Sequence, residues 1–219
     1  MKNKDTKNTK DTNVNRIIEY IRKEIMYSNF KPGEHLKEEK IAKHFNISRV
    51  PVRESLRILH SEGYVEMIPN RGSFVKKISH EYFVEMTNLY LFIAPELLKN
   101  AIPKYKESTF KKADSVINKI EKCKNFSKVG YLLWDFAKVI YSPSDFKFMY
   151  NIMNEIYKHN IRILNDLYEM RKHSQYDLTP HKKFLELCKK NKSGEAIAHW
   201  EDYLKKLSAN LSDIKFKKK

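Results

Sequence analysis

One short β-rich segment interrupts a chain whose apolar residues otherwise recur at helical spacing. Residues 64–68 and 73–78, YVEMI and SFVKKI, flank the turn sequence Pro69-Asn70-Arg71-Gly72, and this arrangement predicts two short strands joined by a tight turn. The 219-residue chain has only five glycines and seven prolines, and its stretches rich in Leu, Ile, Lys and Glu favour helix. The sequence therefore predicts a mainly α protein with one small hairpin.

The β-rich pattern stops after Ile78, and this change predicts two domains. A hydrophobic content of 41 % can bury a sizeable core, and the length suits one large or two small domains. Residues 1–12 are polar and have nothing to bury, so we expect a disordered N-terminal arm before a first domain over residues 13–78. We expect the second domain over residues 79–212 and a basic tail over residues 213–219.

Helical spacing of apolar residues marks three segments of the first domain, residues 13–28, 38–44 and 49–62. Pro32 and Gly33 end the first segment, and Asn46 provides a turn between the second and the third. Ser48 is expected to cap the third helix, with Pro51 in its first turn. Helix, turn and helix followed by a hairpin predict a winged helix-turn-helix, whose second helix enters a DNA major groove.

The third helix is expected to bury one face and to expose a row of arginines. The inward residues are Val52, Leu56 and Leu59, and the outward row is Arg49, Arg53 and Arg57. The planar fork of arginine grips guanine O6 and N7, or phosphate oxygens, with two hydrogen bonds, and Arg71 at the wing tip can reach a groove or the backbone. The alternative is that the arginines are a solvated helix face, which is the usual role of a charged stripe.

Three ordered motifs resemble the DNA-binding domain of the GntR family of bacterial transcription regulators. They are KPGEHL, ISRVPVRESLRILHSEGYVE and NRGSFV, and the resemblance covers about residues 13–78 in register. It implies that the start of the recognition helix and the wing contact operator DNA. The implied contacts, with Arg57 on the same stripe, are Ser48, Arg49, Val50, Pro51, Arg53, Arg57, Asn70, Arg71 and Gly72.

The rest of the chain reads as a bundle of about six helices, near residues 80–102, 107–124, 127–141, 145–172, 177–191 and 194–211. Pro95, Pro103, Pro143 and Pro180 are expected to mark kinks or ends. The stretches FAKVIYSP and HKKFLELCKKNKSGEAIAHWEDYL resemble the FadR-like branch of the family, whose C-terminal effector domain is called FCD.

Many FCD domains hold a divalent metal with one Asp and three His, and the resemblance places Leu133, Ala137, His181 and Tyr203 at those positions. Only one of the four is a ligand, so we expect no metal and no other cofactor. A rebuilt divalent metal site at Asp135, His181 and His199 stays open as an alternative.

Polar residues of the family's ligand pocket are also replaced, because Tyr90 and Ala94 stand where an Arg and a Glu are common. The candidate pocket residues are Tyr90, Trp134, Ala137, His181, His199 and Tyr203. Either these residues line a more apolar, aromatic pocket, or the pocket has collapsed into ordinary core.

The formal net charge of +16 makes a polyanion a plausible partner, although charge alone does not separate nucleic acid from an acidic membrane surface. No apolar run approaches the roughly 20 residues of a membrane span and no signal region is present, so we expect a cytoplasmic protein without a membrane partner. Cys123 and Cys188 match no redox or metal spacing. Without a phosphate loop, a nucleophile elbow or a Cys/His cluster, the chain is not expected to be an enzyme.

The sequence thus predicts a homodimeric, sequence-specific regulator of transcription, a repressor in keeping with the family. It would bind a short inverted-repeat operator and respond to a small-molecule effector in its helical domain. Two alternatives stay open: a dimeric regulator that responds to no effector, and a non-specific architectural DNA-binding protein.

Overall fold

The computed structural model describes the backbone of residues 3–125, 128–170 and 176–212, and side chains within residues 13–125, 128–161 and 176–209. The chain divides into two compact units, with the boundary between Ile78 and Ser79. The expected basic tail, residues 213–219, lies outside the described residues.

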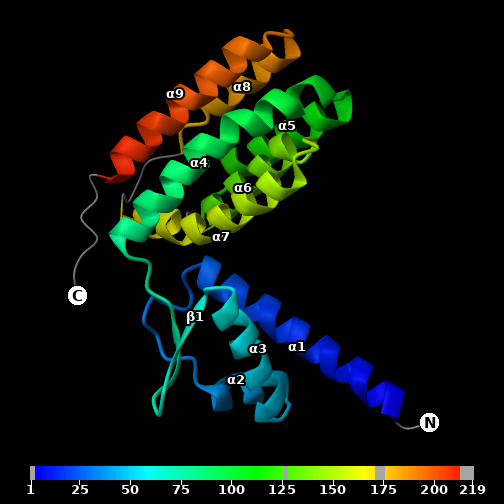
Figure 1. Cartoon of the computed structure of the whole chain (residues 1–219), viewed down its shortest axis with the longest axis vertical. Helices are drawn as coiled ribbons and strands as arrows, with labels where there is room; N and C mark the ends of the chain where they lie inside the picture. Colours follow the sequence, from blue (N-terminus) through cyan, green and yellow to red (C-terminus); the bar gives the residue numbers. More distant parts are fainter. Residues whose placement is uncertain (1–2, 126–127, 171–175, 213–219) are drawn as a thin grey trace. The chain divides into compact units, whose positions relative to one another are not determined.

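The first unit is a winged helix-turn-helix. Its elements are α1 (Asn3–Met26), α2 (Glu38–Phe45), α3 (Arg49–Ser61), β1 (Val65–Ile68) and β2 (Gly72–Val75). Helix α3 packs against α1, α2 and β1, and β1 pairs with β2 in an antiparallel hairpin (Figure 1). The expected helix-turn-helix and hairpin are therefore both present.

Helix α1 is longer than the sequence predicts. It begins at Asn3, whereas residues 1–12 were expected to form a disordered arm, and a helix was expected only from residue 13. Residues 3–12 contain neither glycine nor proline. Because nucleation is the costly step of helix formation, a helix anchored by its packed C-terminal half extends into such a segment at little further cost.

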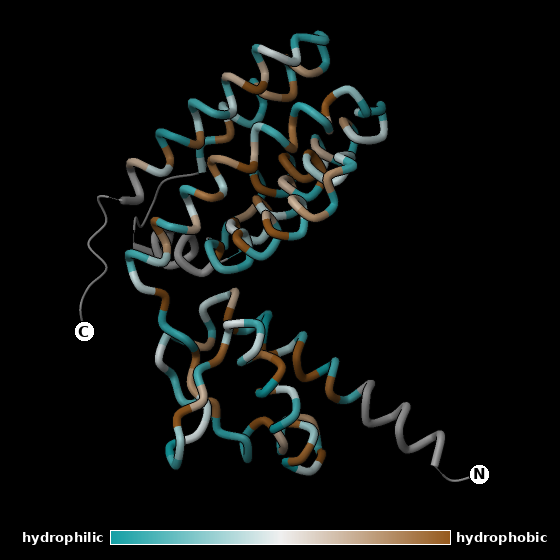
Figure 2. Tube along the Cα trace, in the orientation of Figure 1, coloured by the Kyte–Doolittle hydropathy of each residue, from teal (hydrophilic) through white to brown (hydrophobic). Residues whose placement is uncertain are grey.

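The core of the first unit lies between α1 and α3. Ile17 and Ile21 of α1 are fully buried, and so are the three predicted inward residues of α3, Val52, Leu56 and Leu59. Hydrophobic and hydrophilic residues alternate along both helices at the spacing of helix turns (Figure 2). This pattern buries one face of α3 and leaves the opposite face exposed.

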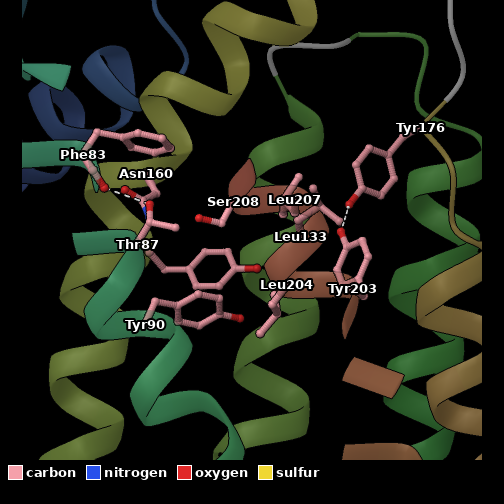
Figure 3. A pocket seen from close by; sticks show the side chains of 11 residues that line it. Phe83, Thr87, Tyr90, Leu133, Asn160, Tyr176, Tyr203, Leu204, Leu207 and Ser208 are labelled. Atoms are coloured by element: carbon pink, nitrogen blue, oxygen red, sulfur yellow. Dashed lines mark hydrogen bonds between the residues drawn. The ribbon is translucent and has the colours of Figure 1, made fainter. Parts of the chain in front are cut away.

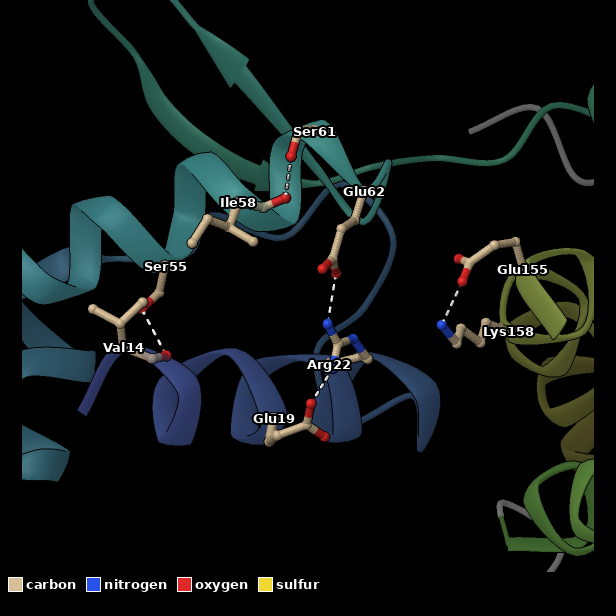
Figure 4. A network of polar contacts seen from close by, with 9 residues as sticks. All are labelled: Val14, Glu19, Arg22, Ser55, Ile58, Ser61, Glu62, Glu155 and Lys158. Carbon is tan, nitrogen blue, oxygen red and sulfur yellow. Dashed lines mark hydrogen bonds and ion pairs between the residues drawn. The ribbon is translucent and has the colours of Figure 1, made fainter. Parts of the chain in front are cut away.

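Polar contacts join the same helices. The buried Ser55 hydroxyl lies 2.8 Å from the Pro51 carbonyl oxygen of its own helix and 3.1 Å from the Val14 carbonyl oxygen of α1. At the C-terminal end of α3, Arg22 of α1 donates to the Glu62 carboxylate, at 2.7 Å, and also contacts Glu19 (Figure 4). These contacts hold α3 against α1 at the middle of α3 and at its C-terminal end.

The hairpin has a well-defined register, from Val65 opposite Val75 to Ile68 opposite Gly72. At its tip Asn70 and Gly72 have positive φ angles of 59° and 95°. A side chain at Gly72 would also place its Cβ 2.8 Å from His35 Nε2. Glycine is therefore required here both by the backbone conformation and by the close approach of the imidazole.

The second unit consists, in its described residues, of six α-helices and one short 3₁₀ helix. They are α4 (His80–Ala101), η1 (Ile102–Lys104), α5 (Glu107–Glu121), α6 (Val129–Tyr141), α7 (Lys147–Met170), α8 (Thr179–Lys189) and α9 (Ser193–Ser212). Helix α4 packs against α6, α7 and α9, α5 packs against α6 and α8, and α8 packs against α9 (Figure 1). The predicted bundle of about six helices is confirmed.

The four prolines of the bundle lie where the predicted helix ranges place them. Pro103 lies in η1, Pro143 follows α6 and Pro180 lies in the first turn of α8. Pro95, by contrast, lies inside α4, which continues to Ala101. Buried residues on both sides of it, such as Ala94 and Leu97, hold the helix together despite the lost hydrogen bond.

A buried polar network crosses the centre of the bundle. Trp200 Nε1 of α9 donates to the Tyr141 hydroxyl of α6 at 2.8 Å, and that hydroxyl lies 3.1 Å from the Tyr90 hydroxyl of α4. All three side chains are buried. Since buried polar groups are costly unless they are hydrogen-bonded, this network specifies how the three helices pack together.

None of the helices that the structure describes combines the length and the apolar character needed to cross a membrane.

Candidate nucleic-acid interface and bundle pocket

The exposed face of α3 carries most of the residues expected to contact DNA. Arg49, Arg53 and Arg57 are all exposed, four residues apart along the helix. Val50, the residue after Arg49, is 60 % exposed. An exposed aliphatic group beside arginines suits a DNA-reading face, because it can contact the methyl group of thymine.

Two residues at the start of this helix differ from expectation in detail. Ser48 occupies the N-cap position with extended backbone angles, but its side chain makes no capping hydrogen bond. Pro51 is buried, although the family resemblance placed it among the DNA contacts. Its ring packs on the inward side of the first turn, so among the residues at the start of the helix it contributes to packing rather than to the exposed face.

The wing carries the second group of expected contacts. Asn70, Arg71 and Gly72 are all exposed at the tip of the hairpin. The Arg71 guanidinium carbon lies 5.8 Å from the centre of the Phe74 ring, and that ring stacks on His35 at 4.8 Å. The arginine is thus supported by an aromatic ring while it remains exposed to a partner.

Two carboxylates of α2 contact the arginines of α3. Arg49 Nη2 lies 2.6 Å from Glu39 Oε1, and Arg53 Nε lies 2.8 Å from Glu38 Oε2. The sequence analysis did not single out Glu38 or Glu39. An available signal was the pair of acidic residues at the start of α2, in the helix that precedes the arginines, but spacing alone does not show which carboxylate meets which guanidinium.

Comparison with known proteins gives the same assignment for the first unit. Residues 13–75 match the family described as "Bacterial regulatory proteins, gntR family". The transcriptional repressor RspR of Escherichia coli K12 is 39 % identical over 64 residues, which are 29 % of this chain and 28 % of that protein. A transcriptional regulator of Streptomyces ambofaciens is 39 % identical over 67 residues, 31 % of this chain and 28 % of its own length. The chain thus matches less than a third of the length of these relatives.

Solved structures of GntR regulators resemble both units. A transcriptional regulator GntR from Rhodococcus sp. RHA1 has a TM-score of 0.80 at 20 % identity, over 91 % of this chain and 97 % of that one. McbR/YncC of E. coli has a TM-score of 0.77 at 16 % identity, over 91 % and 96 % of the two chains. At these low sequence identities, the likeness shows a shared fold and nothing more.

The exposed arginines, the wing and these matches define the first unit as a winged-helix DNA-binding module. Over residues 13–75, which include this helix-turn-helix, the chain matches the gntR family of bacterial regulatory proteins. The family and the matched relatives regulate transcription and are not enzymes. The expected resemblance to the GntR family is therefore confirmed for this unit.

A narrow cavity of about 40 Å³ lies inside the bundle, between α4, α6, α7 and α9 (Figure 3). Tyr90 and Tyr203, two of the expected pocket residues, lie on its wall, together with Phe83, Leu133 and Asn160. The lining residues among the described side chains carry no charge. The volume is small, with room for a few water molecules in this conformation.

The other expected pocket residues do not line this cavity. Ala137 is buried in the packing of α6, and Trp134 Nε1 donates to Asn154 Oδ1 at 3.1 Å. His199 Nε2 lies 3.0 Å from the Pro180 carbonyl oxygen. A small cavity remains, but of these three residues only Ala137 is fully buried, and Trp134 and His199 are half-buried outside the cavity.

The phenols in the cavity are neutral near pH 7, and burial moves their pKa still further above neutrality. It raises the pKa of Tyr157 to about 12 and holds the pKa of Tyr90 well above its ordinary value. Both hydroxyl groups therefore offer hydrogen bonds rather than charge.

His181 lies beside the cavity in an aromatic cage. Its ring centre is 5.0–5.6 Å from those of Phe136, Tyr176, Trp200 and Tyr203. The side chain is buried, and its Nδ1 has no hydrogen-bond partner among the described residues. Burial lowers the pKa of His181 to about 3, so the imidazole is neutral.

The residues of the expected metal positions do not fit a metal ion. Leu133 and Ala137 offer no lone pair, and Asp135 pairs with Lys138 at 2.6 Å. Among the residues with described side chains, no three His, Cys, Asp or Glu gather in a metal-binding arrangement. The alternative site at Asp135, His181 and His199 is thus not assembled in this structure.

We expect His181 to make the second unit less stable in acid. Its pKa is about 3 when folded and has an ordinary value of 6.5, so below pH 6.5 the unfolded chain binds a proton that the folded chain does not. The free energy of unfolding should therefore fall as the pH is lowered from 6.5, with a slope approaching about 1.4 kcal/mol per pH unit from this residue. Urea unfolding followed by tryptophan fluorescence measures it, because Trp134 and Trp200 both lie in the second unit.

In the variant His181→Phe, the free energy of unfolding should decrease less steeply between pH 6.5 and pH 4. The variant His44→Gln, in the first unit, should show the same decrease as the wild type. An equal decrease in His181→Phe and the wild type would contradict the assignment.

Proposed function

We propose that the chain is a sequence-specific regulator of transcription, acting as a repressor, that binds a short inverted-repeat operator as a homodimer. The observation that carries the proposal is the exposed row of Arg49, Arg53 and Arg57 on the second helix of a helix-turn-helix. The repressor RspR, matched over this unit, supports repression as its mode of action. As a regulator of bacterial transcription it would act in the cytoplasm.

In the proposed complex α3 enters the major groove. Its arginines contact guanine or phosphate through their two-pronged guanidinium groups, and Val50 contacts a thymine methyl group. Arg71 of the wing reaches a neighbouring groove or the sugar-phosphate backbone. One recognition helix reads too few base pairs to be selective in a genome, so a two-fold dimer would supply the second half-site.

Replacing an arginine of α3 should weaken operator binding. We expect Arg49→Ala and Arg53→Ala each to cost about 1–3 kcal/mol of binding free energy, because each removes a charged two-pronged contact to DNA. The measurement is fluorescence anisotropy with a duplex that the wild-type protein has enriched from a random pool.

Lys119→Ala is the control, since it removes an equal charge from an exposed position on α5 of the second unit. Unchanged affinity in both arginine variants would remove the assignment. A non-specific architectural protein would instead bind enriched and scrambled duplexes equally, with a steep dependence on salt.

The second unit is proposed to act as an FCD-type effector domain that responds to an uncharged ligand. The cavity offers neutral phenols and no charge among its described lining, which is a poor environment for a carboxylate. Asn160 lines the cavity, and its Oδ1 accepts no hydrogen bond from the described residues (Figure 3). A ligand with an N–H or O–H group would satisfy this oxygen.

Benzamide and benzoate test the proposed ligand class, because they share size and shape but differ in charge. Both are larger than the few water molecules for which the cavity now has room, so binding of either requires the cavity to widen. We expect benzamide at millimolar concentration to raise the melting temperature measured by differential scanning fluorimetry, whereas benzoate should not. Asn160→Leu should reduce the benzamide effect, and Asn154→Leu serves as its control outside the cavity. A larger shift with benzoate would contradict the ligand class, and no shift with either compound would favour the regulator without an effector.

We also expect the bundle to bind no metal. The untagged protein, purified without chelator and analysed by inductively coupled plasma mass spectrometry, should contain far less than one Zn, Ni or Mn per chain, because one imidazole alone does not form a tight site. Near-stoichiometric metal that is lost in His181→Phe would instead show that the bundle assembles a rebuilt site around this histidine.

A further inference from the structure

Helix α2 contributes two carboxylates to the face on which α3 carries its arginines. Glu39 holds Arg49 and Glu38 holds Arg53, at 2.6 and 2.8 Å. Both pairs link residues from different helices of the helix-turn-helix, ten and fifteen positions apart in the chain. The pairing therefore exists only because the turn between α2 and α3 brings the two helices together.

The atoms used in these pairs leave part of each guanidinium for DNA. Arg53 donates to Glu38 through Nε, so neither of its two terminal nitrogens takes part in this bond. Those two nitrogens form the fork that grips guanine O6 and N7. Arg49 uses only Nη2 for Glu39, which leaves its Nη1 and Nε outside this bond. Each arginine is thus held at one edge while another edge remains available.

Carboxylates at this position oppose DNA binding through their charge. Phosphates dominate non-specific affinity, and a negative side chain close to them weakens it. Exposed ion pairs also contribute little to folding stability. Such a pair instead restricts the conformation of the arginine side chain. An unrestrained arginine loses much conformational entropy when it binds a base, and an arginine already held by a carboxylate loses less.

We propose that Glu38 and Glu39 are positioning residues that determine sequence selectivity by holding Arg53 and Arg49 in the orientation that reads bases. The proposal rests on the proposed DNA-binding function of the first unit. It differs from a simple charge effect, since it predicts that the carboxylates raise the preference for operator over other DNA while lowering the affinity for DNA in general.

The test compares wild type with Glu38→Gln and Glu39→Gln on two duplexes, the enriched operator and a scrambled sequence of equal composition. Glutamine keeps the size of the side chain and removes its charge. At one fixed salt concentration, we expect affinity for the scrambled duplex to stay equal or to rise, and the ratio of operator to scrambled affinity to fall about fivefold or more. Glu66→Gln, an exposed carboxylate of β1, is the matched control and should change the ratio less than about twofold.

A double-mutant cycle identifies the route of the effect. If Glu39 acts through Arg49, then Glu39→Gln should leave the ratio unchanged in the Arg49→Ala background, and the same should hold for Glu38→Gln with Arg53→Ala. If the Glu→Gln change still lowers the ratio of operator to scrambled affinity in the Arg→Ala background, the carboxylates read bases directly. That result would overturn the proposal.

Two further outcomes are distinguishable. Equal gains in affinity for both duplexes in Glu38→Gln and Glu39→Gln would show that the carboxylates are only opposing charges, and the positioning role would be wrong. A wild-type protein without preference between the duplexes would instead refute the proposed sequence-specific function itself.

Discussion

The packing of α1 against α3 is the interaction on which the first unit depends. Ile17, Ile21, Leu56 and Leu59 are fully buried between these helices, and each such side chain contributes about 1.5–3 kcal/mol. The exposed ion pairs of the same unit contribute about 0–1 kcal/mol each. Apolar burial therefore decides the rotation of α3 about its axis, and that rotation alone turns Arg49, Arg53 and Arg57 outward.

The exposed face of α3 is then organised by charge rather than by apolar contact. The two carboxylates of α2 form ion pairs at the surface, which contribute little to folding, and they reach the guanidinium groups of Arg49 and Arg53. The wing follows a related principle, because Arg71 lies over the Phe74 ring while staying exposed. Folding and recognition thus use different residues of the same small unit.

The bundle shares its fold with solved structures, whereas the chemistry of its interior depends on the residues of this chain. Its helices pack as in GntR regulator structures with 16–20 % sequence identity. Yet Leu133 and Ala137 occupy positions where the FCD resemblance implies metal ligands, and the phenols of Tyr90 and Tyr157 are neutral. Apolar packing tolerates such exchanges as long as the volume is filled, whereas a metal site does not survive the loss of most of its ligands.

The sequence by itself determined the helical periodicity, the hairpin and the arginine row, because these depend on local spacing: Val52, Leu56 and Leu59 are buried as predicted. Local pattern was insufficient for the start of α1 at Asn3 and for the burial of Pro51. Only the tertiary structure decided that Glu38 and Glu39 meet the arginines and that Tyr90 and Tyr203, but not His181, line the cavity. Those outcomes depend on where separate helices cross, and the spacing of residues within one helix does not contain that information.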